Sequence, residues 1–178
     1  MLVKYMKWLL CYLFLILPVH AADLSIFDET FGDFPEELKH AKAQGKAGVF
    51  IFFEMDECPF CHRMKTTVLN QPRVIDYFKK NFLMFSVDIE GDVEMTDFQG
   101  KVMPMKDFAF KQHRVRATPV LAFFDLQGKL VAKYTGATAD ADEFLLLGEY
   151  VLSGAYKDSN FTSYKRDQRK ITGKASGG

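Results

Sequence analysis

The sequence has few cysteines and no excess of charge of either sign, and each shortage excludes a class of protein. Three cysteines in 178 residues are too few for the network of disulfides that holds small secreted domains together. Lysine and arginine number 23, as do aspartate and glutamate, and a net charge of zero argues against nucleic-acid binding. The sequence also lacks a Ser-His-Asp spacing, a phosphate-binding glycine loop, an internal repeat and an interdomain linker.

Residues 1–21 predict a cleaved signal peptide. Lys4 and Lys7 precede the apolar stretch 9–19, and Val19-His20-Ala21 places small residues where a signal peptidase cleaves. An uncleaved anchor is the alternative, but the apolar stretch is short for a bilayer span, which needs roughly 20 residues. We therefore expect a periplasmic protein with no stable membrane anchor after cleavage.

Cleavage would leave about 157 residues, enough for one domain with its own core. We expect a monomer with a domain over residues 22–155 and a polar tail over residues 156–178. The tail contains a cluster of cations, Lys165, Arg166, Arg169 and Lys170, and we interpret it as solvated, with a docking patch as the alternative.

Loss of the leader would also remove Cys11, so that only Cys58 and Cys61 remain. A bridge between cysteines with two residues between them closes almost no loop and constrains the unfolded chain little. This pair must therefore be explained by reactivity or by a ligand. The motif Cys58-Pro59-Phe60-Cys61 follows the apolar run 49–53 and opens a segment with a helical pattern.

A helix that begins at the motif would assign different roles to the two thiols. Its free N–H groups and positive dipole end would face Cys58 and favour the thiolate, so Cys58 is the predicted nucleophile. Cys61, three residues on, shares its helix face and is the predicted resolving thiol. Pro59 suits the first turn, and Phe60 offers an apolar surface to a partner. The pair can then close as a redox-active Cys58–Cys61 disulfide and reopen.

Helical and extended patterns alternate along the rest of the chain, which predicts an α/β fold with helices covering a mixed sheet. Two histidines, His40 and His113, fall in helix-like segments and are expected to face solvent. The pattern predicts strands over residues 47–53, 82–87, 118–124 and 130–134, helices over residues 34–45, 72–80 and 104–113, a last helix from an Asp140 cap to Gly154, and a surface excursion over residues 91–102.

From about Phe27 to Gly154 the chain resembles the thioredoxin superfamily. Three features carry the resemblance: the strand running into Cys58-Pro59-Phe60-Cys61, Val115-Arg116-Ala117-Thr118-Pro119 opening a strand, and the hairpin Phe124-Asp125-Leu126-Gln127-Gly128-Lys129. Residues 91–98 and 150–156 are similar to the periplasmic branch called SoxW. The resemblance implies a thioredoxin-like fold, a central mixed sheet flanked by helices, and an activity without a cofactor.

The resemblance also implies how the site meets its partners. Pro119 would be cis, with the Thr118 backbone facing the sulfurs and pairing with a substrate strand. Protein disulfides would be the substrates, and a membrane thiol carrier would supply electrons beside sulfur-oxidising proteins. A general periplasmic thioredoxin serving cytochrome maturation fits almost as well, and we favour a reductant over an oxidant by analogy.

Several positions depart from thioredoxin. Glu57 stands where thioredoxin has tryptophan before the first cysteine, and Phe52 replaces a buried aspartate that accepts a proton from the resolving thiol. Glu54 is a possible proton acceptor if it points inward, and a solvated Glu54 is the alternative. Asp56 and Glu57 would oppose ionisation of Cys58, whereas a protonated His62 would favour it.

Two other functions start from the same cysteines. Cys58-Pro59-Phe60-Cys61-His62 is the attachment pattern of c-type haem, and Met84, Met95, Met103 or Met105 would supply a second axial ligand. A compact helical cytochrome, however, would have neither the buried strand before the motif nor the later Thr-Pro strand. A copper(I) carrier using both thiols, His62 and methionines is the second alternative. We expect neither, and predict no metal site.

Overall fold

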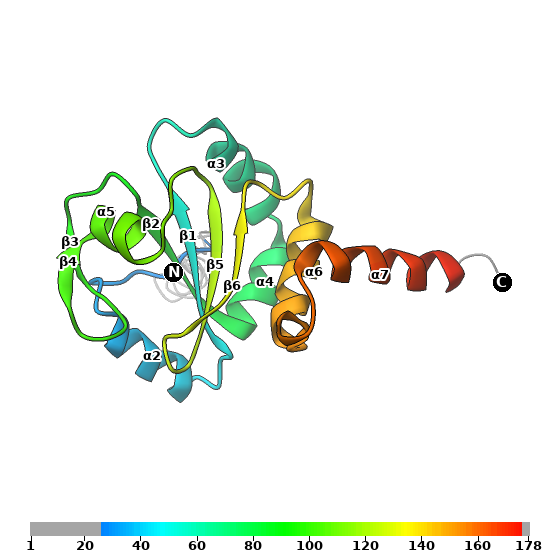
Figure 1. The fold of residues 1–178 in the computed structure, drawn as a ribbon, viewed down its shortest axis with the longest axis horizontal. Coiled ribbons are helices and arrows are strands. Elements are labelled where there is room, and N and C mark those ends of the chain that lie inside the picture. The colour runs from blue at the N-terminus through cyan, green and yellow to red at the C-terminus, as the bar shows by residue number, and fades with distance from the viewer. Residues whose placement is uncertain (1–25, 176–178) are drawn as a thin grey trace, which may run out of the picture.

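The computed structural model describes residues 26–175 (Figure 1). The predicted leader, with Cys11, lies outside these residues. Between residues 26 and 175, no helix has the length and apolar character needed to cross a bilayer. The elements in chain order are α2 (Phe34–Ala43), β1 (Gly48–Glu54), α3 (Pro59–Met64), the π-helix η1 (Lys65–Leu69), α4 (Pro72–Asn81), β2 (Phe82–Asp88), β3 (Glu94–Thr96), β4 (Val102–Pro104), α5 (Met105–Asp107), the π-helix η2 (Phe108–Gln112), β5 (Val120–Asp125), β6 (Leu130–Thr135), α6 (Ala141–Leu152), the 3-10 helix η3 (Ala155–Lys157) and α7 (Phe161–Ala175).

The main sheet has four strands in the order β2-β1-β5-β6. Strand β1 runs parallel to β2, with Gly48 opposite Phe82 and Glu54 opposite Asp88. It runs antiparallel to β5, which in turn pairs antiparallel with β6. The predicted mixed sheet and its four strands are therefore confirmed, and each strand end lies within about two residues of its predicted place.

Side chains of β1 alternate between two hydrophobic cores, one on each face of the sheet. Phe50 and Phe52 lie in the core shared with α3, α4 and α6, whereas Ile51 and Phe53 lie in the core shared with α2 and η2. Figure 1 shows α4 and α6 on the side of the sheet opposite to α2 and α5. Because both faces are covered, the strand is apolar from Gly48 to Phe53, as parallel-paired central strands usually are.

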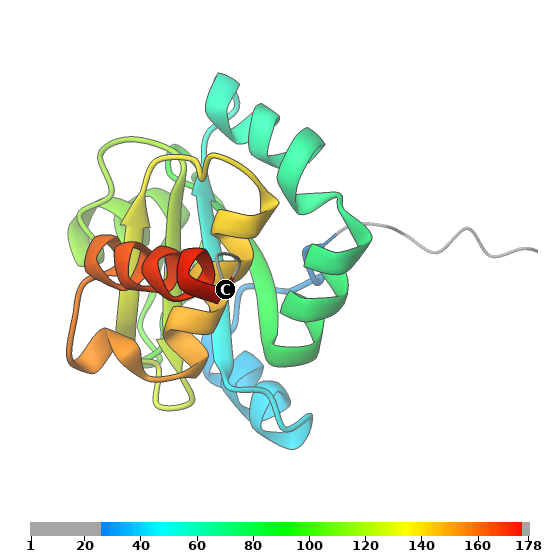
Figure 2. The same ribbon diagram turned by 90° about the vertical axis from the view of Figure 1, so that its right-hand side faces the viewer.

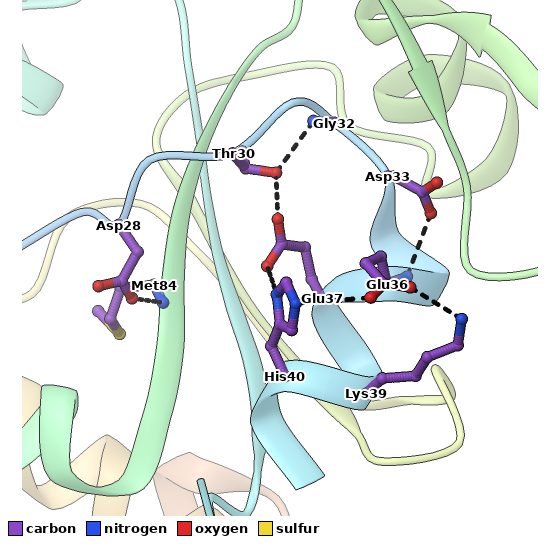
Figure 3. A network of polar contacts seen from close by, with 9 residues as sticks. All are labelled: Asp28, Thr30, Gly32, Asp33, Glu36, Glu37, Lys39, His40 and Met84. Carbon is purple, nitrogen blue, oxygen red and sulfur yellow. Dashed lines mark hydrogen bonds and ion pairs between the residues drawn. The ribbon is translucent and has the colours of Figure 1, made fainter. Parts of the chain in front are cut away.

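The segment before α2 covers the outer edge of β2 and then starts the helix (Figure 3). Asp28 N donates to the Met84 carbonyl at 2.7 Å, and Met84 N donates to Asp28 Oδ2 at 2.8 Å. The Asp33 carboxylate accepts from Glu36 N at 3.1 Å and so caps the start of α2. These contacts satisfy backbone groups that an open edge strand would leave free.

Residues 91–102, predicted as a surface excursion, instead enter a small two-stranded sheet of β3 and β4. Met95 and Met103 lie opposite each other and are both buried, and Thr96 N donates to the Gly32 carbonyl at 2.7 Å. Residues paired across two neighbouring strands turn their side chains to the same face, so Met95 and Met103 together anchor the segment to the core. The helix predicted over residues 104–113 is present as short α5 and the π-helix η2.

The interpretation of residues 156–178 as a solvated tail is wrong for the start of α7. Phe161 is 8% exposed and packs edge-on against Tyr134 of β6 and beside Tyr150 of α6, with ring centroids 5.6 and 5.5 Å apart. Lys165 forms an ion pair with Glu143. Figure 2 shows α7 lying across α6 and β6. The polar composition of residues 156–178 predicts exposure, and it gave no sign that Phe161 would pack against α6 and β6.

His113 does not face solvent as expected. Its ring lies against Phe108 and Phe124, with centroids 4.5 and 5.1 Å apart, and its Nε2 atom is buried without a hydrogen-bond partner. Burial lowers the pKa of His113 to about 4; nearby Lys133 acts in the same direction and Asp97 acts against it. The imidazole therefore behaves as part of the core on the α2 side of the sheet.

Candidate active site

Cys58 and Cys61 lie at the start of the helix that follows β1. Cys58 is the N-cap residue of α3, and α3 continues directly into η1. The two sulfurs are joined in a disulfide with an S–S distance of 2.03 Å, and Cys61 N donates to Cys58 Sγ at 3.0 Å. Cys58 is 6% exposed and Cys61 2%, so Cys58 is the more accessible residue of the two.

The residues around the cysteines take the places that the sequence predicts. Pro59 occupies the first turn of α3, where a missing N–H breaks no helical hydrogen bond. Phe60 is 61% exposed and is free to contact another protein. His62 is exposed and lines the same pocket as both cysteines.

Thr118 and Pro119 lie at the same end of the sheet as the cysteines, where β1 ends. The antiparallel register places Val120 opposite Phe53, so the two residues before Val120 lie beside the end of β1. The Thr118–Pro119 peptide bond is cis, and the Thr118 hydroxyl is buried without a hydrogen-bond partner. Chain segments 60 residues apart in the sequence thus meet at one end of β1.

Glu54 faces a pocket of about 190 Å³ that both cysteines line. Its side chain is 15% exposed, and its carboxylate accepts hydrogen bonds from Lys65 Nζ at 2.6 Å and from the Ser86 hydroxyl. The alternative of a solvated Glu54 is therefore wrong. Phe52, two residues earlier on the same face, is fully buried. Compared with the buried aspartate that thioredoxin has at the position of Phe52, the Glu54 carboxylate of this chain therefore lies nearer the end of the strand.

The matched family model and the geometry of the pair together identify the fold. The sequence matches the model described as a thioredoxin-like domain over residues 34–152. The chain belongs to the thioredoxin-like family. Among curated proteins, no sequence matches it.

Solved structures share this thioredoxin-like fold. A thioredoxin-fold protein from Helicobacter pylori is 20% identical, with a TM-score of 0.62 over 84% of this chain and 96% of that one. A putative disulphide-isomerase from Bacteroides thetaiotaomicron is 28% identical, with a TM-score of 0.55 over 75% and 94% of the two chains. A thioredoxin from Thermus thermophilus is 25% identical, with a TM-score of 0.53 over 67% and 84%.

The thioredoxin-like fold and its Cys58–Cys61 disulfide support thiol:disulfide oxidoreductase activity. The α/β fold is not the compact helical cytochrome that the haem alternative requires. Within the part of the chain that the structure describes, no group of three or more His, Cys, Asp or Glu side chains is placed to hold a metal ion. Met84, Met95 and Met103 are buried in the two cores.

Sequence reasoning missed three residues that hold the site together. Lys65 and Ser86 bind the Glu54 carboxylate, and Arg63 Nη2 donates to the Thr138 carbonyl at 3.0 Å, tying α3 to the loop before α6. Lys65 lies four residues after Cys61, so helical spacing could have indicated its shared face. Ser86 and the Arg63 contact depend on strand register and loop path, which carry no local sequence signal.

Proposed function

We propose that this chain is an exported, periplasmic protein-disulfide reductase of the SoxW type, in which Cys58 is the nucleophile and Cys61 the resolving thiol. The observation that carries the proposal is a disulfide between the N-cap residue of α3 and a residue one turn later. In the reduced protein, the Cys61 N–H that now contacts Cys58 Sγ would stabilise a thiolate on that sulfur.

The reaction transfers two electrons in two exchanges. The Cys58 thiolate attacks one sulfur of a substrate disulfide, forms a mixed disulfide and releases the other substrate sulfur as a thiolate. Cys61, after losing its proton, attacks Cys58 Sγ and displaces the second substrate sulfur. The substrate leaves as a dithiol, and the protein is left with the Cys58–Cys61 disulfide. A membrane thiol donor would then reduce this disulfide for the next cycle.

The surface around Cys58 suits a polypeptide substrate. Thr118 and Pro119 lie beside the end of β1 that leads to the cysteines, and the exposed Phe60 ring lies between the two cysteines on α3. Exposed aromatic rings beside a reactive atom supply apolar contact area at low conformational cost. His62 lines the pocket, where it would add positive charge near Cys58 when protonated.

Glu54 is our proposed proton acceptor for Cys61. It lines the same pocket as the cysteines and is held in place by Lys65 and Ser86. We expect Glu54→Gln to slow turnover by about tenfold or more and to change its dependence on pH, because the amide cannot take up a proton. Glu149→Gln, an exposed change on α6, is the matched control. An unaltered rate and pH profile in Glu54→Gln would contradict this role.

Insulin reduction by the protein without residues 1–21 tests the proposed activity. We expect turnover that Cys58→Ser abolishes, and a stable mixed disulfide with substrate in Cys61→Ser, because no second thiol can release it. No turnover in the unmodified protein would overturn the proposal. The reduction potential tests the direction: a value near about −270 mV indicates a reductant, and one near about −120 mV an oxidant.

Export has its own test, which does not depend on activity. The full chain, expressed in a bacterium, should be recovered from the periplasm with Ala22 as its first residue. Recovery of the intact chain in the membrane fraction would instead support the uncleaved anchor.

A further inference from the structure

A second pocket lies at the same end of the main sheet as the disulfide pocket. It has a volume of about 550 Å³ and is lined by Ile89, Glu90, Lys106, Asp107, Phe110, Val115 and Arg116. Asp88 lines the disulfide pocket, and the next two residues, Ile89 and Glu90, line the second one. Both pockets therefore reach the carboxyl end of β2, where Ile89 N also donates to the Glu54 carbonyl at 2.8 Å.

The floor of this second pocket is apolar and part of it is open to solvent. Phe110 is 53% exposed, although it belongs to the π-helix η2, which otherwise buries Phe108 and Ala109 in the core. Val115 and Ile89 complete the apolar surface. An exposed aromatic ring inside a pocket, at the same end of the sheet as a reactive disulfide, is the kind of feature that anchors a side chain of a binding partner.

The side-chain charge left unpaired after the ends of β1 and β2 is negative. Lys65 and Lys106 are paired with Glu54 and Asp92. Within the described residues, no ion pair is formed by the four carboxylates that follow β1 and β2: Asp56, Glu57, Asp88 and Glu90. These carboxylates lie at one end of the sheet because β1 and β2 are parallel neighbours whose carboxyl ends point the same way.

Two cations line the second pocket, and of these Lys106 is paired with Asp92, whereas Arg116 forms no ion pair within the described residues. The Arg116 guanidinium carbon stands 5.5 Å from the centre of the Phe110 ring, a cation–π distance, two residues before Thr118. Its charge therefore interacts with the ring. From the sulfurs outward, a bound segment would meet the carboxylates first and the Phe110 ring second.

We propose that the second pocket binds the disulfide-bearing segment of the partner protein, and that this segment carries a basic residue next to its cysteine and an aromatic residue just beyond. The inference rests on the proposed function, because it concerns the substrate of the same disulfide. The basic residue faces the carboxylates, and the aromatic ring enters the pocket at Phe110. The shared position of the two pockets at the carboxyl end of β2 and the complementary charge together select this occupant.

Three synthetic peptides, each dimerised through one cysteine, serve as probes. The first has lysine next to the cysteine and phenylalanine beyond it, the second has glutamate in place of lysine, and the third has alanine in place of phenylalanine. The reduced protein should reduce the first probe about fivefold faster than either of the others at low salt. The advantage over the glutamate probe should vanish near 1 M salt, where the Debye length is about 3 Å.

Matched variants locate the effect. Phe110→Ala should abolish the preference for phenylalanine over alanine, whereas Phe31→Ala, a fully exposed ring outside both pockets, should not. Glu90→Lys should reduce the preference for lysine over glutamate, whereas Glu149→Lys, the same change of charge on α6, should not. Equal rates for the three probes, or equal effects of variant and control, would overturn the inference while leaving the proposed function intact. If no probe is reduced at all, the proposed function fails and the inference fails with it.

Discussion

The half-buried His113 predicts a loss of stability in mild acid. In the unfolded chain its pKa is near 6.5, whereas in the folded protein burial, assisted by Lys133 and opposed by Asp97, lowers that pKa to about 4. The unfolded state therefore binds more protons between these values, so the free energy of unfolding is highest above pH 6.5 and falls as the pH drops towards 4.

The size of the loss follows from the two pKa values. With 6.5 unfolded and about 4 folded, the linkage relation gives about 2 kcal/mol lost between pH 7 and pH 5. The ring is only partly buried, so solvent screening reduces this, and we expect about 1 kcal/mol. The pKa of Asp97 is also lowered, because hydrogen bonds from Gln112 and two backbone N–H groups outweigh its burial, but that contribution is lost at lower pH.

Urea unfolding followed by far-ultraviolet circular dichroism at pH 7 and pH 5, at equal ionic strength, measures this loss. His113→Phe fits the same aromatic surroundings without a titrating group, so it should lose about 1 kcal/mol less than the unmodified protein between the two pH values. His40→Gln, a change at an exposed histidine of α2, should behave like the unmodified protein. If His113→Phe and the unmodified protein lose the same stability, the assignment of acid sensitivity to this ring is refuted.

Three further substitutions test the fold. Phe161→Ala should lower the free energy of unfolding by about 2–3 kcal/mol and release α7, seen as lost helical signal, because the ring is buried between α6 and β6. Asp140→Ala should cost about 1 kcal/mol in urea unfolding, since its carboxylate caps α6 by accepting from Glu143 N at 2.8 Å, whereas Asp158→Ala should cost less than about 0.5 kcal/mol. Gly128→Ala should cost more than about 1 kcal/mol, because φ is +71° and an added Cβ would stand 2.6 Å from Phe98 Cβ; equal stability would contradict this packing.

Local patterns predicted the elements that bear the reactive groups. Three local signals are the apolar run before Cys58, the proline at the first helical position and the carboxylate cap at Asp140. Each of them acts on residues only a few positions away from it in the chain. For that reason the sequence alone was enough to predict the buried strand, the motif helix and the capped last helix of the domain.

Features that depend on distant contacts were not predictable in this way. Met95 and Met103 become buried because two short strands pair across a loop, and Phe161 becomes buried because the chain turns back onto α6. His113 lies among aromatic rings from three separate elements, which no helical pattern reveals. In each case the residue lies in a largely polar stretch of the sequence, which predicts exposure. The residue is nevertheless wholly or partly buried, because its packing partner comes from a distant part of the chain.

The direction of α7 has a practical consequence. Its first turn is fixed by Phe161, and Figure 1 shows its far half standing clear of the rest of the fold and well away from α3. A fusion partner or a surface linker attached beyond this helix would therefore be held at a distance from the sulfurs. Immobilisation through the carboxyl terminus should leave the redox pair open to large protein substrates, which makes that end the natural tether for capturing mixed disulfides.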